Sequence, residues 1–127
     1  MSPGVASVSR VITQERIDAY ADASGDHNPI HVDPDFARAT PFGGAIAHGM
    51  LVLALIGEMM HAAHGDAWLA SGKLKVRFKA PTPAGETVTA SATLAKEVDG
   101  IAEYAVQCAT SAGEVVIEGR ASVPVSA

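Results

Sequence analysis

Along this chain, apolar residues recur at helical spacing up to about residue 72 and alternate with polar residues from there onward. The longest apolar segment spans residues 43–63, and it predicts a helix from about His48 to His64, with Gly65 just past its end. The uninterrupted part covers only residues 49–57. That is far short of the roughly 18–20 residues that cross a bilayer, so we expect the helix at the centre of a domain.

Shorter elements precede this helix. Thr13 suits the N-cap of a helix over residues 14–23, and the Asn28-Pro29 pair predicts a turn. Asp33 and Pro34 suit the N-cap and the first position of a second, short helix. We expect that short helix to turn Phe36 and Ala37 inward.

The second half of the chain is predicted to form strands. Residues 73–79 alternate between basic and apolar side chains, and Asp99-Gly100 is a strong hairpin signal. We predict an α+β fold in which one apolar helix is wrapped by a curved antiparallel sheet, and we expect a second copy to cover exposed edges. The predicted elements are a short strand or entry segment over residues 5–12, then a four-stranded meander of residues 73–79, 87–97, 101–110 and 114–125.

Composition narrows the class of protein. With 127 residues, 48% of them hydrophobic and 18% charged, the chain predicts a single globular domain over residues 1–127. Its net charge of −5 disfavours a nucleic-acid binder. Cys108, the one cysteine, reads as a small buried residue. The first residues do not resemble a signal peptide, so we expect a cytoplasmic protein.

An acid and a base lie five residues apart around the Asn28-Pro29 turn. Asp26 and His31 could share the two proton transfers of an addition or an elimination. The alternative is that these residues only cap turns and helices. A metal site is a further alternative, but the spacing matches no known helical ligand pair, and we predict none. Its ligands would come from Asp26, His27, His31, Asp33, His48, His61 and His64.

A second polar island, His48-Gly49-Met50, opens the long helix. The main-chain N–H of Gly49 would lie in the first turn, where it has no intrahelical acceptor and the helix dipole is positive. It could therefore hold a developing oxyanion, or Gly49 could simply permit close packing.

The basic face of residues 73–79 concentrates positive charge in an acidic protein. It is either a solvated, protected edge or a local site for the phosphates of a nucleotide-bearing substrate. On the second interpretation Arg77 and Lys79 are candidate substrate-binding residues, and we place His48 in the same group.

The string Asp26-His27-Asn28-Pro29-Ile30-His31-Val32-Asp33, followed by Phe42, Ile46 and His48-Gly49-Met50, resembles the MaoC-like, R-specific enoyl-CoA hydratases of the hotdog fold. The resemblance extends loosely to Val76–Pro81 and the Pro83-Ala84-Gly85 turn. It implies a homodimer of joined sheets, with active sites close to the dimer interface.

The resemblance also implies a reaction, the reversible addition of water to a trans-2-enoyl thioester to give a (3R)-hydroxyacyl thioester. Asp26 would deprotonate the water, His31 would deliver a proton to the α-carbon, Asn28 would support the pair, and Gly49 would hold the thioester oxygen. No metal or redox cofactor is implied, and CoA or acyl carrier protein would carry the substrate. Two helical turns after His48, some relatives with short-chain substrates carry a polar or bulkier residue, whereas this chain has residues 54–57, Ala-Leu-Ile-Gly.

Three other functions stay open. A 3-hydroxyacyl-carrier-protein dehydratase would use the same site in the direction of water loss. A thioesterase of the same fold would need a carboxylate directed at the carbonyl group. A non-catalytic binding subunit is disfavoured because both Asp26 and His31 are present.

Overall fold

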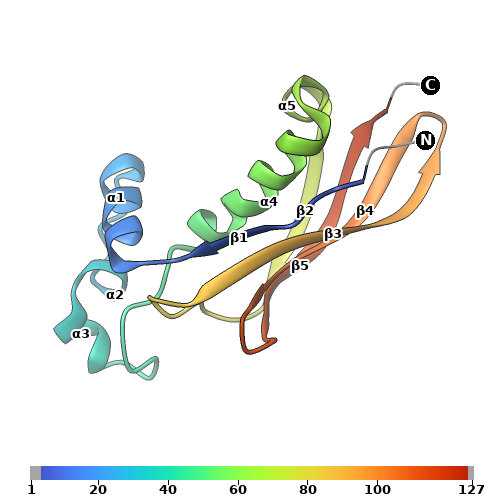
Figure 1. The fold of residues 1–127 in the computed structure, drawn as a ribbon. Helices are drawn as coiled ribbons and strands as arrows, with labels where there is room; N and C mark the ends of the chain where they lie inside the picture. The colour runs from blue at the N-terminus through green and yellow to red at the C-terminus, as the bar shows by residue number, and fades with distance from the viewer. Residues whose placement is uncertain (1–3, 126–127) are drawn as a thin grey trace.

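The computed structural model describes residues 4–125, which form one curved sheet, a long helix against it and four short helices (Figure 1). The strands are β1 (Val8–Val11), β2 (Lys73–Phe78), β3 (Thr87–Val98), β4 (Ile101–Thr110) and β5 (Val115–Pro124). The helices are α1 (Gln14–Ser24), α2 (Pro29–Val32), α3 (Pro34–Arg38), α4 (Gly49–His64) and α5 (Asp66–Ser71).

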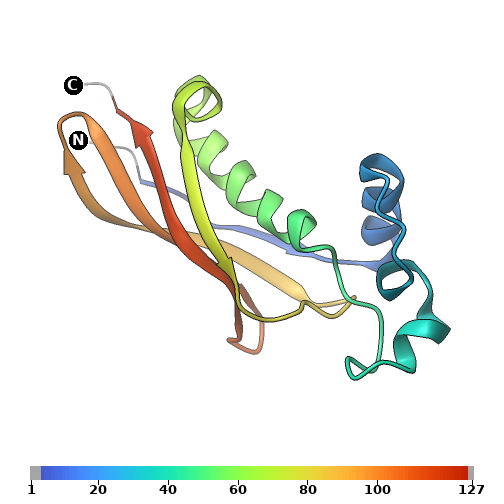
Figure 2. The same ribbon diagram turned by 180° about the vertical axis from the view of Figure 1, so that it is seen from behind.

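The sheet is antiparallel with the strand order β1-β3-β4-β5-β2. The predicted Asp99-Gly100 hairpin joins β3 to β4, and both residues have positive φ, 54° and 76°. The predicted four-stranded meander is wrong in one respect. Only β3, β4 and β5 follow each other in the sheet, whereas β2 pairs with β5 at the far edge (Figure 2). Pairing with β5 instead of β3 leaves β1 and β2 as the two edges.

The long helix α4 supplies the inner layer of the core. Its buried face consists of Val52, Leu55, Ile56, Met59 and Met60. Burial of side chains of this size contributes roughly 1.5–3 kcal/mol each. The opposing sheet presents small and medium residues, among them Val88, Ala90, Val106 and Cys108. The predicted helix bounds are confirmed, and the predicted hotdog arrangement of one helix inside a curved sheet is present (Figure 1).

No helix in residues 4–125 is long and apolar enough to span a membrane.

The N-terminal helices lie beyond one end of α4 (Figure 1). The two predicted N-caps are confirmed: the Thr13 side chain accepts from the N–H of Arg16, and Asp33 accepts from the N–H groups of Asp35 and Phe36. Ala37 is buried as expected, but Phe36 is 49% exposed. The inward orientation of Phe36 is therefore wrong, because successive positions of a helix point about 100° apart and Ala37 takes the buried side of α3.

The sequence analysis missed two short helices. Residues 29–32 form α2, because the Asn28 side chain accepts from the N–H of Ile30 and Pro29 begins the helix. Residues 66–71 form α5 after Gly65, whose positive φ reverses the chain. Neither helix carries a long apolar period, so only short-range capping signals mark them.

Candidate active site

Asp26 and His31 face each other across the turn between α1 and α2. α1 ends at Gly25 in the left-handed conformation, and α2 begins directly after Asn28. The Oδ2 atom of Asp26 lies 4.0 Å from Nε2 of His31. This distance is too long for a direct hydrogen bond, but one water molecule can contact both atoms. The turn therefore brings the acid and the base together.

The second nitrogen of His31 fixes which atom can exchange a proton. Nδ1 lies 2.7 Å from the carbonyl oxygen of Ile46. A carbonyl oxygen only accepts hydrogen bonds, so Nδ1 carries a proton and donates it. Nε2, on the side of Asp26, is then free to take up or release a proton. The Asp26 side chain is 55% exposed and that of His31 only 13%, so solvent reaches the pair from the carboxylate.

Asn28 shapes the turn through its main chain and through a cap. Its N–H donates to Oδ1 of Asp26 at 3.2 Å, and its side-chain oxygen accepts from the N–H of Ile30 at 3.2 Å. The first bond holds one carboxylate oxygen of Asp26 in place and leaves Oδ2 near His31. The arrangement thus offers Asn28 a supporting role that does not require its side chain to touch the pair.

His48 lies behind the pair. The residue is only 3% exposed, and its Nε2 atom lies 2.9 Å from the main-chain oxygen of Asp26. Its ring stacks on that of His31, with centroids 3.9 Å apart, and meets the ring of Tyr20 edge-on at 4.9 Å. Within residues 4–125 the Nδ1 atom of His48 is buried without a partner. This burial leaves His48 little surface for contact with a substrate.

Gly49 begins α4 beside a cavity of about 420 Å³. His31, Gly49, Val52, Phe78 and Lys79 are among its lining residues. First-turn N–H groups have no intrahelical acceptor, and the positive end of the helix dipole favours an anionic oxygen there. A Cβ atom at Gly49 would lie 2.9 Å from the Phe78 ring. Glycine therefore permits the close approach of the Phe78 ring, and its N–H belongs to the first turn of α4.

Asp26, His31 and His48 form the group, among the described residues, that could hold a metal ion, with ligand atoms within 4.8 Å of one another. His48 suits this poorly, because its Nε2–H already donates to a carbonyl oxygen and its Nδ1 is enclosed. The donor set therefore reduces to one carboxylate and one imidazole, fewer than the three protein ligands of a typical catalytic zinc site.

The remaining candidate ligands lie elsewhere. His27 points to Asp22 at 3.0 Å, and this hydrogen bond raises the pKa of His27. Asp33 caps α3. His61 and His64 lie in the last turn of α4, at the opposite end from Gly49.

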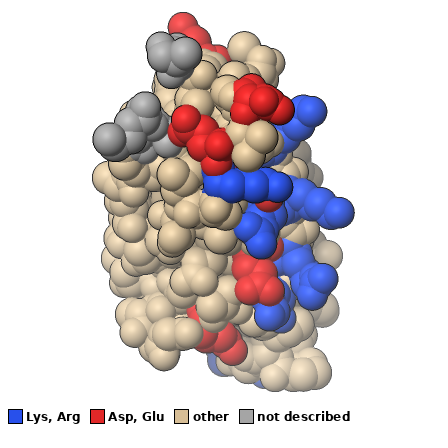
Figure 3. All heavy atoms as spheres, turned by 90° about the vertical axis from the view of Figure 1, so that its right-hand side faces the viewer, with Lys and Arg blue, Asp and Glu red and all other residues tan. Residues whose placement is uncertain are grey.

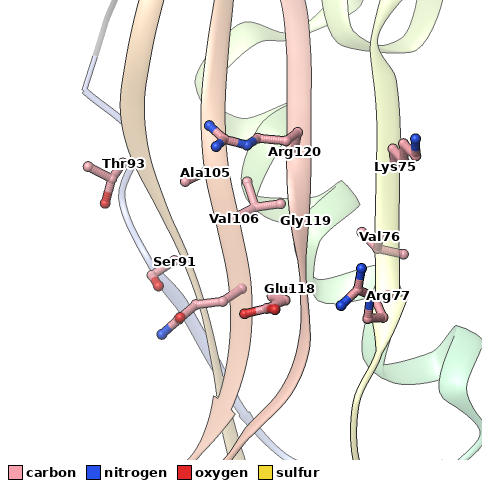
Figure 4. A pocket seen from close by; sticks show the side chains of 11 residues that line it. Lys75, Val76, Arg77, Ser91, Thr93, Ala105, Val106, Glu118, Gly119 and Arg120 are labelled. Carbon is pink, nitrogen blue, oxygen red and sulfur yellow. The ribbon is translucent and has the colours of Figure 1, made fainter.

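Arg77 and Lys79 line different cavities. Lys79 lines the cavity beside His31, and its Nζ pairs with Glu118 at 3.1 Å. Arg77 lines a second cavity of about 730 Å³, together with Lys75 and Arg120. This cavity lies on the face of the sheet away from α4, and cationic side chains gather in a column on the surface (Figures 3 and 4).

Sequence reasoning missed two parts of the site. The Ile46 carbonyl belongs to a loop segment bridged to Pro83, a long-range contact without a local signal. Phe78 was assigned to a strand but not to the site, although its position at the end of β2 beside the Gly49 cavity makes it a lining residue. Only the apolar side of the alternation in β2 could have pointed to Phe78.

Comparison with known proteins places this geometry in a family. A family model described as "MaoC like domain" matches residues 3–115. The "3-hydroxyacyl-thioester dehydratase Z" of Mycobacterium tuberculosis is 43% identical over 114 residues, covering 87% of this chain and 74% of the relative. The "(R)-specific enoyl-CoA hydratase" of Rhodospirillum rubrum is 37% identical over 124 residues, covering 96% and 85%.

A solved structure has the same fold. An "(R)-hydratase from A. caviae involved in PHA biosynthesis" superposes with a TM-score of 0.86 at 27% identity, covering 99% of this chain and 97% of that one. The relatives named above are hydratases and dehydratases, which confirms the predicted hydro-lyase class and, at a coarse level, the addition or loss of water on acyl thioesters. The chain therefore belongs to the MaoC-like domain family of hotdog hydratases and dehydratases.

Proposed function

We propose that this protein catalyses the reversible hydration of trans-2-enoyl thioesters to (3R)-hydroxyacyl thioesters. The observation that carries the proposal is the 4.0 Å gap between Asp26 Oδ2 and His31 Nε2, beside a cavity that Gly49 also lines. One water molecule in this gap would contact both titratable groups at once. The names of the relatives given above supply the substrate class and the stereochemistry.

In the hydration direction, the Asp26 carboxylate takes one proton from the water molecule, while the water oxygen bonds to C3 of the enoyl substrate. His31, carrying a proton on Nε2, delivers that proton to C2. The Nδ1–H···O bond to Ile46 keeps the ring oriented during the transfer. In dehydration the same groups exchange roles, since His31 removes the C2 proton and Asp26 protonates the departing hydroxyl group.

Negative charge develops on the thioester oxygen as C3 is attacked. The N–H of Gly49 would donate to this oxygen at the positive end of α4. Removal of one such donor typically costs about 10²–10³ in kcat. The rest of the cavity is largely apolar, with Val52, Phe78 and Ile117 in its lining, which suits an acyl thioester.

The mechanism requires no metal or redox cofactor, and CoA or acyl carrier protein would carry the acyl group. Carrier-protein dehydration is the second candidate, because a "3-hydroxyacyl-[acyl-carrier-protein] dehydratase, mitochondrial" of Arabidopsis thaliana is 33% identical over 119 residues. A homodimer and a cytoplasmic location stay predictions.

Loss of enoyl absorbance with crotonyl-CoA and longer enoyl-CoAs tests the reaction. We expect Asp26→Ala and His31→Ala each to lower kcat by about 10²–10⁴, because each removes one partner of the proton transfer. His27→Ala is the matched control, since His27 is adjacent in sequence but points to Asp22, and we expect native kcat for it. Full activity of Asp26→Ala or of His31→Ala would refute the assigned roles. Release of the thiol without loss of the enoyl group would indicate a thioesterase.

The carrier can be tested through the cationic residues. We expect Arg77→Glu and Lys79→Glu to raise KM for an enoyl-CoA more than for a short pantetheine thioester, because only the former carries the nucleotide phosphates. Lys96→Glu is the control, as Lys96 lies on β3 and pairs with Glu103 at 3.5 Å. Equal changes of KM for both substrates would rule out phosphate binding by these residues.

A further inference from the structure

His48 contacts each of the three parts of the candidate active site. Its Nε2 atom hydrogen-bonds the main-chain oxygen of Asp26, and its ring stacks on that of His31. Its own backbone is the N-cap of α4, directly before Gly49. The turn that holds Asp26 leads directly into the four-residue helix of His31, whereas His48 at the start of α4 follows Asp26 by 22 residues. His48 is the residue at which these parts meet.

The chemistry of the hydrogen bond defines the state of the His48 ring. The Asp26 oxygen is a carbonyl and only accepts, so Nε2 of His48 must carry a proton. A second proton, on the enclosed Nδ1, would find no acceptor among the described residues. Nε2 of His48 is therefore a fixed donor to the Asp26 carbonyl oxygen.

Few other bonds hold Asp26. The hydrogen bonds of its N–H and of its Oδ1 atom are made with Ser24 and Asn28, within the same turn. Among residues 4–125, the bond from His48 is the one that reaches the Asp26 main chain from outside this turn. Asp26 is also more than half exposed, so little packing restrains it. Without the His48 donor, the turn would be free to move Oδ2 away from His31.

The capping geometry supports a dedicated role. Ser, Thr, Asp and Asn are preferred at helix N-caps because their side chains bond the first-turn N–H groups. His48 occupies that position but makes no side-chain cap hydrogen bond. The ring N–H of His48 is directed at Asp26 instead. A substitution of His48 therefore does not remove a side-chain cap from α4.

We propose that His48 is a positioning residue, which sets the 4.0 Å gap between Asp26 and His31 through its Nε2–H bond to the Asp26 carbonyl and its stacking on His31. This inference rests on the proposed function. A displacement of about 1 Å at reacting groups can cost about 10²-fold in rate. The effect falls on kcat, because His48 is buried and does not itself line the cavity proposed to receive substrate.

The test compares three substitutions at this position in enoyl-CoA hydration. His48→Phe keeps an aromatic ring and loses the donor, whereas His48→Gln keeps an amide N–H near the position of Nε2. We expect kcat to fall about tenfold or more in His48→Phe and to stay within about threefold of native in His48→Gln, with KM nearly unchanged in both. His48→Asn is the second donor-removing variant if the Phe ring does not fit. Its amide is too short to reach Asp26, and it should lose kcat as His48→Phe does.

Ile56→Val serves as the control for lost stability. Ile56 is fully buried on α4 and lines neither cavity described above, so we expect a lower Tm with native kcat. Native kcat in His48→Phe or His48→Asn would overturn the inference, as would an equal loss in His48→Gln. If native protein does not hydrate enoyl thioesters, the proposed function fails instead, so the two failures are distinguishable.

Discussion

Cys108 illustrates how strongly the interior controls a single side chain. It is fully buried on β4, and its Sγ donates to the main-chain oxygen of Val52 on α4 at 3.7 Å. Burial raises the pKa of this thiol to about 12. Because the thiolate is the reactive form, the folded protein holds almost none of it at neutral pH. The sequence analysis expected a small buried residue, and this is confirmed.

We therefore expect no reaction of native protein with a disulfide reagent such as dithiobisnitrobenzoate at pH 8. In guanidinium chloride the same protein should release one equivalent of thionitrobenzoate, because the unfolded thiol is exposed. Absorbance over an hour distinguishes the two states. Stoichiometric labelling of the native protein within minutes would show that the β4–α4 contact opens readily.

At the scale of elements, α4 carries different chemistry at its two ends. Its first turn faces the cavity beside His31, and its last turn holds His64, whose Nε2 lies 3.0 Å from the Tyr104 hydroxyl. Burial lowers the pKa of His64 from its ordinary value of 6.5, despite the helix dipole that favours a cation there. Desolvation therefore outweighs the dipole at this end.

The lowered pKa makes stability depend on pH. Below about 6.5 the unfolded chain binds a proton at His64 that the folded chain does not, so the stability that neutral His64 supports is lost as the pH falls through the folded pKa. We expect the decline in unfolding free energy from pH 8 to pH 5, measured with urea, to be smaller in His64→Gln than in native protein.

His27→Gln is the control, because the pKa of His27 is shifted in the opposite direction from that of His64. The pKa of His27 is raised, so any stability it contributes is present at low pH and lost as the pH rises. Removing it should make the decline toward pH 5 no smaller than in native protein. A flatter profile in His27→Gln than in His64→Gln would contradict both assignments.

At the scale of the whole molecule, the sheet of residues 4–125 ends in two strand edges without a partner strand, and apolar residues lie near one of them. β1 and β2 end the strand order. Phe78 at the end of β2, Phe42 in the loop before α4 and Met50 on α4 are each more than half exposed. Exposed edges and apolar side chains favour association. The same residues Phe42 and Phe78 line the cavity beside His31.

We expect a homodimer in solution, with a mass by light scattering near twice the protomer's 13.0 kDa. Covering Phe78 and the edge of β2 with a second copy would remove this apolar surface from water. Phe78→Asp should shift the mass toward one protomer, whereas Phe36→Asp, at an exposed residue on α3, should not. A native mass of one protomer at micromolar concentration would rule out the dimer.

The sequence determined the local elements and the chemical groups. The apolar period located α4 within a residue, the Asp99-Gly100 pair located the β3–β4 hairpin, and Thr13 and Asp33 marked helix starts. These features depend on neighbours a few residues apart, which a sequence displays directly. Asp26 and His31 belong to the same class, because one short turn separates them.

The tertiary structure decided what depends on residues far apart in the chain. It paired β2 with β5, where Gly119 lets the backbones approach closely at Lys75, a contact that a Cβ atom would block. It separated Arg77 from the cavity that Lys79 lines. It also buried His48, a candidate substrate-binding residue in the sequence, beside Asp26 and His31. Such contacts arise from packing over the whole sheet, and no periodicity in the sequence encodes them.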